Sequence, residues 1–241
     1  MKNKASKISI LIATFFILTS CSADLFNSVT GNRNVLKQVR KTSENFTGIK
    51  VSSGIDLYII QGSRNNITIE ADENLHDIIK TEINNDVLKI YTEKNIWRSK
   101  AKKVFVTIQD LHFIKASSGS DVKNNESITV DNILISASSG ANVNLQLVAK
   151  SVETNASSGA DIKLAGTSIS HDSNASSGAA INSFKLESTM GVARASSGAN
   201  IKIYASKTVK ANASSGGNIN VKGMPQEIDK NTSSGGNISI N

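Results

Sequence analysis

Apolar or small side chains occupy every second position over long stretches of the chain. Between Val152 and Leu164 they alternate with polar or charged residues, and the following stretch keeps the same phase up to Ile181. A period of two is typical of a β-strand, whereas a helix repeats its apolar positions every three to four residues. The pattern therefore predicts strands, with one set of alternate side chains turned toward a core.

One short phrase, Ala-Ser-Ser-Gly-Ala-Asn/Asp-Val/Ile, returns seven times from residue 116 to the end of the chain, with small variations. Successive copies are separated by 21, 19, 19, 20, 18 and 19 residues. A fixed period of this kind indicates a solenoid, in which each repeat forms one coil stacked on the next. We therefore predict an all-β fold, a right-handed single-stranded parallel β-helix with about 19–21 residues per coil. The glycines of the seven copies are Gly119, Gly140, Gly159, Gly178, Gly198, Gly216 and Gly235.

We interpret the repeated glycine as the corner residue of each coil. A positive φ, or a close approach to the next coil, would exclude a Cβ at such a corner. The apolar residue three positions later belongs to the inward set, so these residues should stack along the core. The predicted stack contains Ile162, Ile181, Ile201 and Ile219.

The chain begins with the features of an export signal. Three lysines precede an apolar run from Ile8 to Leu18, which is too short to span a membrane as a helix. The run ends in Leu18-Thr19-Ser20-Cys21, which resembles a bacterial lipobox, and Cys21 is the only cysteine of the chain. We predict that residues 1–20 are a lipoprotein signal peptide and that Cys21 carries the lipid. The alternative is an ordinary signal peptide followed by an unrelated cysteine.

Three further segments are predicted behind the signal peptide. Residues 21–44 are polar with no sustained period, so they are interpreted as a tether. Residues 45–241 are predicted to form the β-helical domain. Ser52-Ser53-Gly54 is a degenerate first copy of the phrase, 65 residues before Gly119, so residues 45–115 are expected to form looser coils and residues 116–241 the regular ones.

The order of these segments resembles a known family, the auto-transporter adhesin head GIN domain. The resemblance covers about residues 45–241, and it implies a β-helical domain of secreted or lipid-anchored proteins of didermal bacteria. It transfers no catalytic residue. The segments that carry it are Ile49–Ile59 with Gln61 and Gly62, then Ile69–Leu75, Val87–Ile90 and the ladder of Ser-Ser-Gly phrases.

The polar residue that follows each corner should form a row along the outside of the solenoid. Such a row could bind a cation or a glycan, or its amides could hydrogen-bond to one another between coils. Ala180 interrupts the row, and the second interpretation is favoured. The predicted polar row consists of Asn142, Asp161, Asn200, Asn218 and Asn237.

A second candidate is the stretch from Glu93 to Lys103, which contains the only tryptophan and five basic residues. It could be a solvated loop whose Trp97 lies on the coil wall, or a contact loop, because tryptophan and arginine are enriched at binding hot spots. The candidate binding residues are Lys94, Trp97, Arg98, Lys100, Lys102 and Lys103.

Charge and motifs exclude several functions. The formal charge is +7, of which residues 1–20 carry three lysines, so about +4 remains, and we expect no nucleic-acid partner. The three histidines are scattered, and we expect no metal site and no cofactor. Glu153, Asp161 and Asp172 are too dispersed along the sequence to predict an acid/base pair.

The expected function is that of a non-enzymatic envelope or surface lipoprotein with an adhesin-like binding role. We expect anchoring to the membrane through the N-terminal lipid, in the outer membrane, and a glycan, an anionic surface or an envelope protein as partner. The alternatives are an envelope-sensing module and, less favoured, a polysaccharide-active enzyme. The oligomeric state is not predicted.

Overall fold

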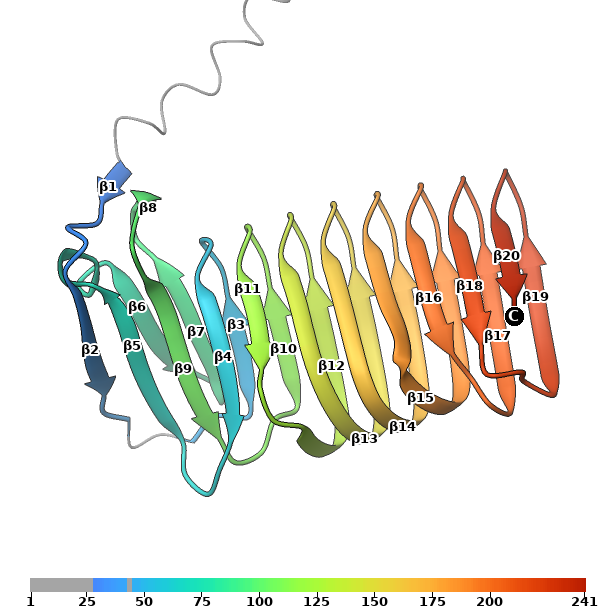
Figure 1. The fold of residues 1–241 in the computed structure, drawn as a ribbon, viewed down its shortest axis with the longest axis horizontal. Coiled ribbons are helices and arrows are strands. Elements are labelled where there is room, and N and C mark those ends of the chain that lie inside the picture. Colours follow the sequence, from blue (N-terminus) through green and yellow to red (C-terminus); the bar gives the residue numbers. More distant parts are fainter. Residues whose placement is uncertain (1–27, 43–44) are drawn as a thin grey trace, which may run out of the picture.

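The computed structural model describes residues 28–42 and 45–241, and it is a parallel β-solenoid of about seven turns. Figure 1 shows the coils stacked side by side, each with a narrow turn at the same edge. The described ranges contain strands and one short 3-10 turn, Glu73–Leu75, and no helix in them is long and apolar enough to cross a membrane. The predicted fold class, an all-β solenoid of stacked coils, is confirmed.

Each regular coil has two faces joined by the Ser-Ser-Gly turn. The strands that lead into the turn form one parallel sheet, here the pre-turn sheet, and those that leave it form the post-turn sheet. Three long strands bend around the opposite edge and contribute to both sheets, namely β13 (Asn142–Ala156), β14 (Asp161–Ala175) and β15 (Ala180–Ala195). The pre-turn sheet also contains β7 (Val87–Thr92), β3 (Gly48–Val51), β10 (Phe113–Ala116), β12 (Ile128–Ala137), β17 (Thr208–Ala213) and β19 (Glu227–Thr232). The post-turn sheet also contains β9 (Lys102–Ile108), β4 (Asp56–Gln61), β11 (Asp121–Asn124), β16 (Asn200–Tyr204), β18 (Asn218–Lys222) and β20 (Asn237–Ile240).

The Ser-Ser-Gly phrase forms a tight two-residue turn of type I′. Ser158 has φ 51° and Gly159 has φ 69°, and the amide of Ala160 donates to the carbonyl of Ser157 at 3.2 Å. A type I′ turn requires positive φ at both central residues. The amide of Gly159 also donates to the carbonyl of Ser177 in the next coil, at 3.2 Å. The corner prediction is confirmed, with the serine sharing the left-handed conformation.

Steric crowding requires glycine at Gly217 but not at the turn residue Gly159. A Cβ on Gly159 would meet no atom within 4 Å, so its conformation and not its surroundings requires glycine. At Gly217, where most copies have alanine, a Cβ would lie 2.5 Å from the carbonyl oxygen of Ala195. The later coils therefore approach one another too closely for alanine at this position.

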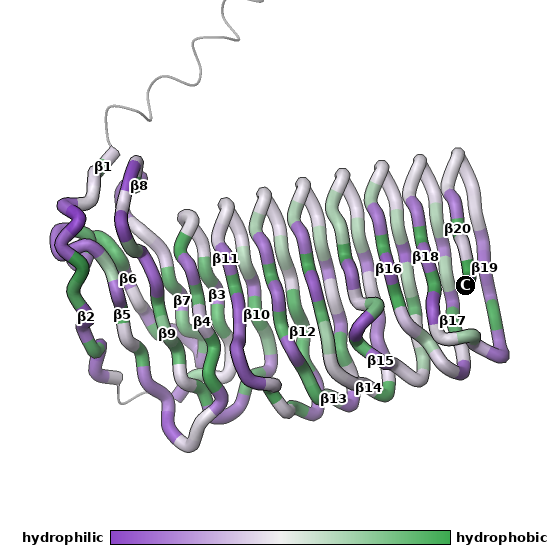
Figure 2. Tube along the Cα trace, viewed as in Figure 1, coloured by the Kyte–Doolittle hydropathy of each residue, from purple (hydrophilic) through white to green (hydrophobic). Residues whose placement is uncertain are grey.

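The core is a stack of aliphatic side chains between the two sheets. Ile162, Ile181, Ile201 and Ile219 pair in register from coil to coil, and each is at most 1% exposed. Figure 2 shows hydrophobic and hydrophilic positions alternating along the coils. The predicted inward phase is confirmed.

The N-terminal third is not a set of looser coils in series. Strands β10 and β11 pair directly with β3 and β4, so the intervening residues lie on the far side of this first coil. There β5 (Asn66–Asp72) runs antiparallel to β9, and β6 (Ile79–Asn84) runs antiparallel to β7. Alternation identified these strands but carried no information about their partners or direction, so the looser-coil prediction is wrong.

The tether prediction is also wrong for residues 28–40. Strand β1 (Ser28–Thr30) pairs in parallel with β8 (Asn95–Arg98), and β2 (Val35–Arg40) pairs antiparallel with β5 and ends the post-turn sheet. These residues therefore belong to the folded domain and cover the edge that the first strands would otherwise expose. The remainder of the predicted tether, the signal peptide and Cys21 lie outside the described residues, apart from residues 41 and 42.

Asp72 holds this N-terminal end together. Its buried carboxylate accepts hydrogen bonds from the backbone amides of Arg33, Lys100 and Ala101, at 2.9–3.1 Å. Burial alone would raise the pKa of Asp72, but these amide donors outweigh it and lower the pKa. The charged side chain thus joins the β1–β2 connection to the β8–β9 connection.

Candidate functional site

A groove runs along the outer side of the pre-turn sheet, across successive strands and next to the turns. It has a volume of about 750 Å³. Its walls are mainly short polar side chains, because the residue directly before the alanine or threonine of each phrase and the first serine of each turn both point outward. We call it the asparagine groove, after Asn155, Asn174, Asn212 and Asn231, which line it with Arg194 and with Ser138, Ser157, Ser176, Ser196, Ser214 and Ser233.

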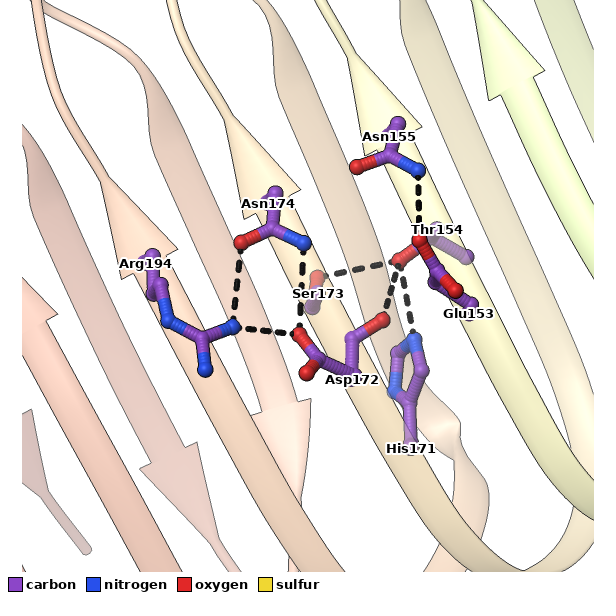
Figure 3. Close-up of polar contacts among 8 residues, drawn as sticks. All are labelled: Glu153, Thr154, Asn155, His171, Asp172, Ser173, Asn174 and Arg194. Carbon is purple, nitrogen blue, oxygen red and sulfur yellow. Dashed lines mark hydrogen bonds and ion pairs between the residues drawn. The ribbon is translucent and has the colours of Figure 1, made fainter.

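Arg194 is the centre of the polar network in this groove (Figure 3). Its Nη1 lies 2.7 Å from Oδ1 of Asp172 and 3.2 Å from Oδ1 of Asn174. The Asn174 amide donates to the same carboxylate at 3.2 Å, and Asn155 makes the equivalent bond to Glu153 at 3.0 Å. Asn174 thus donates to Asp172 and accepts from Arg194, and the Asn155 amide is oriented along its strand by Glu153.

Glu153 and Asp172 are direct neighbours, although the sequence suggested that they were dispersed. They pair in register on adjacent strands of the pre-turn sheet, because one coil separates them by nineteen residues. Asp172 is bound by Arg194 and Glu153 by Asn155. Both carboxylates therefore serve as acceptors that orient the groove's amides.

A buried polar cluster lies on the inner side of the same strands. His171 is 1% exposed, and its Nε2 lies 3.0 Å from Oγ1 of Thr154, which also donates to Ser173 at 3.2 Å. Burial lowers the pKa of His171 to about 4, against a smaller opposing effect of Asp172. His171 is therefore neutral at physiological pH and is a core residue, with no hydrogen-bond partner at Nδ1.

The predicted polar row exists, on the opposite sheet from the groove. Asn142 pairs with Asp161, Ala180 interrupts the row as expected, and Asn200, Asn218 and Asn237 follow in register. The row also continues to Asp121 and Asp56, which were not among the predicted members.

Two side chains of this row, those of Asp161 and Asn218, make their contacts within their own coils, which contradicts for them the favoured interpretation of hydrogen bonds between coils. Asp161 lies 3.5 Å from Nζ of Lys163, and the Asn218 amide donates to the carbonyl of Gly216 at 3.3 Å. At the acidic end, partial burial and then the neighbouring Asp121 carboxylate raise the pKa of Asp56.

The Trp97 stretch is a strand rather than a loop at its centre. Asn95–Arg98 form β8, and Lys102 and Lys103 begin β9. Lys103 is bound to Glu70 at 3.1 Å, and the backbone amide of Lys100 is bound to Asp72. Trp97 is 59% exposed, which contradicts a position against the coil wall, and Lys94 and Arg98 are exposed on either side of it.

Sequence reasoning therefore found the polar row and the Trp97 stretch but missed the asparagine groove. A signal for it was present in the sequence. In five consecutive copies, from Asn155 to Asn231, an asparagine or arginine stands two positions before the first serine of the phrase.

Within residues 28–42 and 45–241, no group of three or more His, Cys, Asp or Glu side chains could hold a metal ion.

Comparison with known proteins identifies the family. The family model described as "Putative auto-transporter adhesin, head GIN domain" matches residues 45–225. This chain belongs to the head GIN domain family. No curated protein sequence matches this GIN-domain chain.

Solved structures share the fold of this GIN domain. A "putative adhesin" from Bacteroides fragilis has a TM-score of 0.82 at 19% identity, covering 89% of this chain and 100% of its own. A "putative adhesin" from Parabacteroides merdae has a TM-score of 0.71 at 19% identity, covering 89% and 99%. A "Putative lipid binding protein" from Parabacteroides distasonis has a TM-score of 0.71 at 21% identity, with the same coverage. At these identities the likeness concerns the fold.

Proposed function

We propose that this GIN domain is a non-enzymatic binding module of the bacterial envelope, and that it holds extended carbohydrate in the asparagine groove. The observation that carries the proposal is the groove itself, about 750 Å³ lined by repeated amides and hydroxyls. Sugars present many hydroxyl groups, and amide side chains offer both a donor and an acceptor to each. A row repeated once per coil suits a ligand that also repeats along its length.

Substitution of three groove residues tests this function. Asn155→Ala, Asn174→Ala and Asn212→Ala together remove three of the four asparagine amides of the groove but leave the strands and core unchanged. Three lost hydrogen bonds should weaken binding at least about tenfold. The assay is a neutral glycan array, followed by affinity measurement on the best oligosaccharide.

A matched control exists on the other sheet. Asn142→Ala, Asn200→Ala and Asn237→Ala remove the same three groups from exposed positions of the polar row on the post-turn sheet. The control should bind neutral glycans as the wild type does. Equal losses in both triple variants, or no loss in the groove variant, would contradict the assignment.

Anchoring is proposed through Cys21, in the outer membrane. The Leu18-Thr19-Ser20-Cys21 sequence supports a thioether-linked lipid. Labelling cells with a palmitate analogue should mark the wild type and leave Cys21→Ala unlabelled and unprocessed or freely soluble. An unlabelled wild type would remove the basis for the anchor and would leave the groove proposal unaffected.

A second candidate role is contact with the membrane surface at the Trp97 end. Six residues lie between Cys21 and Ser28, so the seven steps from one Cα to the other can span at most about 25 Å. Strand β1 pairs with β8, which places the exposed Trp97 and Arg98 at the same end. Tryptophan is enriched at membrane interfaces, and basic side chains favour anionic headgroups.

A further inference from the structure

The post-turn sheet carries a row of lysines on alternate coils. Lys123, Asn144, Lys163, Asn182, Lys202 and Asn220 pair in register in that order across six strands. Neighbouring strands lie about 4.8 Å apart, so the lysines of this row recur at roughly 9–10 Å. We call Lys123, Lys163 and Lys202 the lysine row; all three side chains are exposed.

An aromatic side chain is added to this surface by an irregularity in β15. The register between β14 and β15 shifts between Lys163 and Ala165, so Ser183 and Phe184 together oppose Leu164. A bulge of this type re-aims a side chain, and it accounts for the extra residue in the coil from Gly178 to Gly198. Phe184 is the residue that the bulge inserts.

Two lysines lie close to the inserted ring. Nζ of Lys222 lies 4.7 Å and Nζ of Lys202 lies 6.0 Å from the centroid of Phe184. The bulge therefore produces a partly exposed aromatic ring with two cations close to it, and the following copy has a second aromatic residue, Tyr204, at the same distance from its glycine. The regular stacking of the coils does not require such a feature.

The charge on this part of the sheet is strongly one-sided. The post-turn segments 161–165, 180–185, 200–204 and 218–222 contain one carboxylate, Asp161, against Lys163, Lys185, Lys202 and Lys222. Asp161 lies 3.5 Å from Lys163, which leaves an excess of positive charge toward Phe184. An anionic partner is thus the complementary one.

The spacing selects among anionic partners. A nucleic-acid strand carries one charge per roughly 3.4 Å, which is about three times denser than the lysine row. A linear polysaccharide with one acidic group per disaccharide has charges much further apart, close to the interval of alternate coils. The asparagines between the lysines can bond its neutral hydroxyls or amides, and the Phe184 ring can pack against the C–H face of a sugar.

We propose that the lysine row and Phe184 form a binding surface for a linear acidic polysaccharide that lies along the solenoid axis, across the strands. Lysine contributes point charges to this surface rather than bidentate contacts, which suits a polymer that can shift along the row. The surface lies on the opposite sheet from the asparagine groove, so the two proposals can fail separately.

The test measures the affinity of the whole protein, purified in detergent, for hyaluronan, which has one carboxylate per disaccharide. Lys163→Gln with Lys202→Gln should weaken this binding roughly tenfold, and added salt should weaken the binding of the wild type. Phe184→Leu, which keeps an apolar side chain at the bulge, should also weaken it. Dextran, a neutral polymer, should not depend on any of these residues.

The matched control removes the same charge elsewhere. Lys150→Gln with Lys210→Gln eliminates two exposed lysines that lie outside this surface and pair with Asp131 and Asp229. It should retain wild-type affinity. Equal losses of affinity in the two double variants would mean that only the net charge of the protein matters, and would overturn the proposal. Unchanged hyaluronan binding by Lys163→Gln with Lys202→Gln would also overturn it. Binding of anionic phosphatidylglycerol vesicles with the same dependence on Lys163 and Lys202, and none of hyaluronan, would assign the surface to a membrane instead.

Discussion

Acidification should destabilise this protein through one buried side chain, His171. In the folded state its pKa is about 4, whereas an exposed histidine in the unfolded chain has a pKa of about 6.5. Between these values the unfolded state binds the proton and the folded state does not, so the free energy of unfolding falls as pH is lowered. Linkage gives a loss of roughly 2 kcal/mol at pH 5 and about 3 kcal/mol at pH 4, relative to pH 7.

Replacing His171 with valine should remove this loss. Val152 occupies the same position one coil earlier, so valine fits the strand and the inward face. The smaller side chain will lower stability at pH 7 by leaving space in the core, and Thr154 loses a hydrogen-bond partner. The diagnostic quantity is therefore the change between pH values, not the stability at one pH.

Urea unfolding monitored by circular dichroism at pH 7, 6, 5 and 4.5 measures that change for both proteins. The carboxylates whose pKa is lowered in the folded state, Asp72 and Glu70, lose their contribution at still lower pH, and they do so in both proteins. The wild type should lose roughly 2 kcal/mol more than His171→Val between pH 7 and pH 5. Equal losses would refute the interpretation of His171 as a buried neutral residue.

Three further changes test the fold and the second candidate surface. Gly159→Val should cost about 1–3 kcal/mol by thermal unfolding, because a β-branched residue is strained at φ 69°; an unchanged melting temperature would argue against this. Ile181→Ala should cost about 2–5 kcal/mol, whereas Lys163→Ala, on the outward side, should stay within about 0.5 kcal/mol; equal effects would reverse the assigned faces. Trp97→Ala with Arg98→Ala should abolish attachment to anionic vesicles and leave the melting temperature nearly unchanged, and loss of stability with retained attachment would place the site elsewhere.

The regular coils could be predicted from the sequence because each one repeats the information that specifies it. The alternation of apolar and polar residues predicted that Ile162 and Ile181 face the core. The period predicted that these two residues pair on neighbouring coils. The left-handed conformation of Ser158 was not predicted, because serine has no marked preference for it. There the hydrogen bond from Gly159 to the next coil contributes to holding the turn in place, and that contact is not local.

The N-terminal third could not be predicted in the same way, because outside the Ser52-Ser53-Gly54 turn it contains no copy of the phrase. Its strands were found, but pairing between β5 and β9, or between β1 and β8, depends on contacts between distant residues that alternation does not encode. The asparagine groove was missed for a related reason. Glu153 and Asp172 are nineteen positions apart in the chain and adjacent in the sheet, so reading along the sequence separates what the coil brings together.

The long segment between β4 and β10, which separates the first coil from the second along the chain, also has a consequence for the order of folding. In the regular part Ile162 pairs with Ile181, nineteen positions further along the chain, whereas Ile49 pairs with Ile114, 65 positions further along. Loop closure over the longer distance costs about 1 kcal/mol more, and contacts between distant residues slow folding. The repeated coils should therefore nucleate the structure although they are synthesised last, and the N-terminal end, which faces the proposed anchor, should be the last part to become ordered.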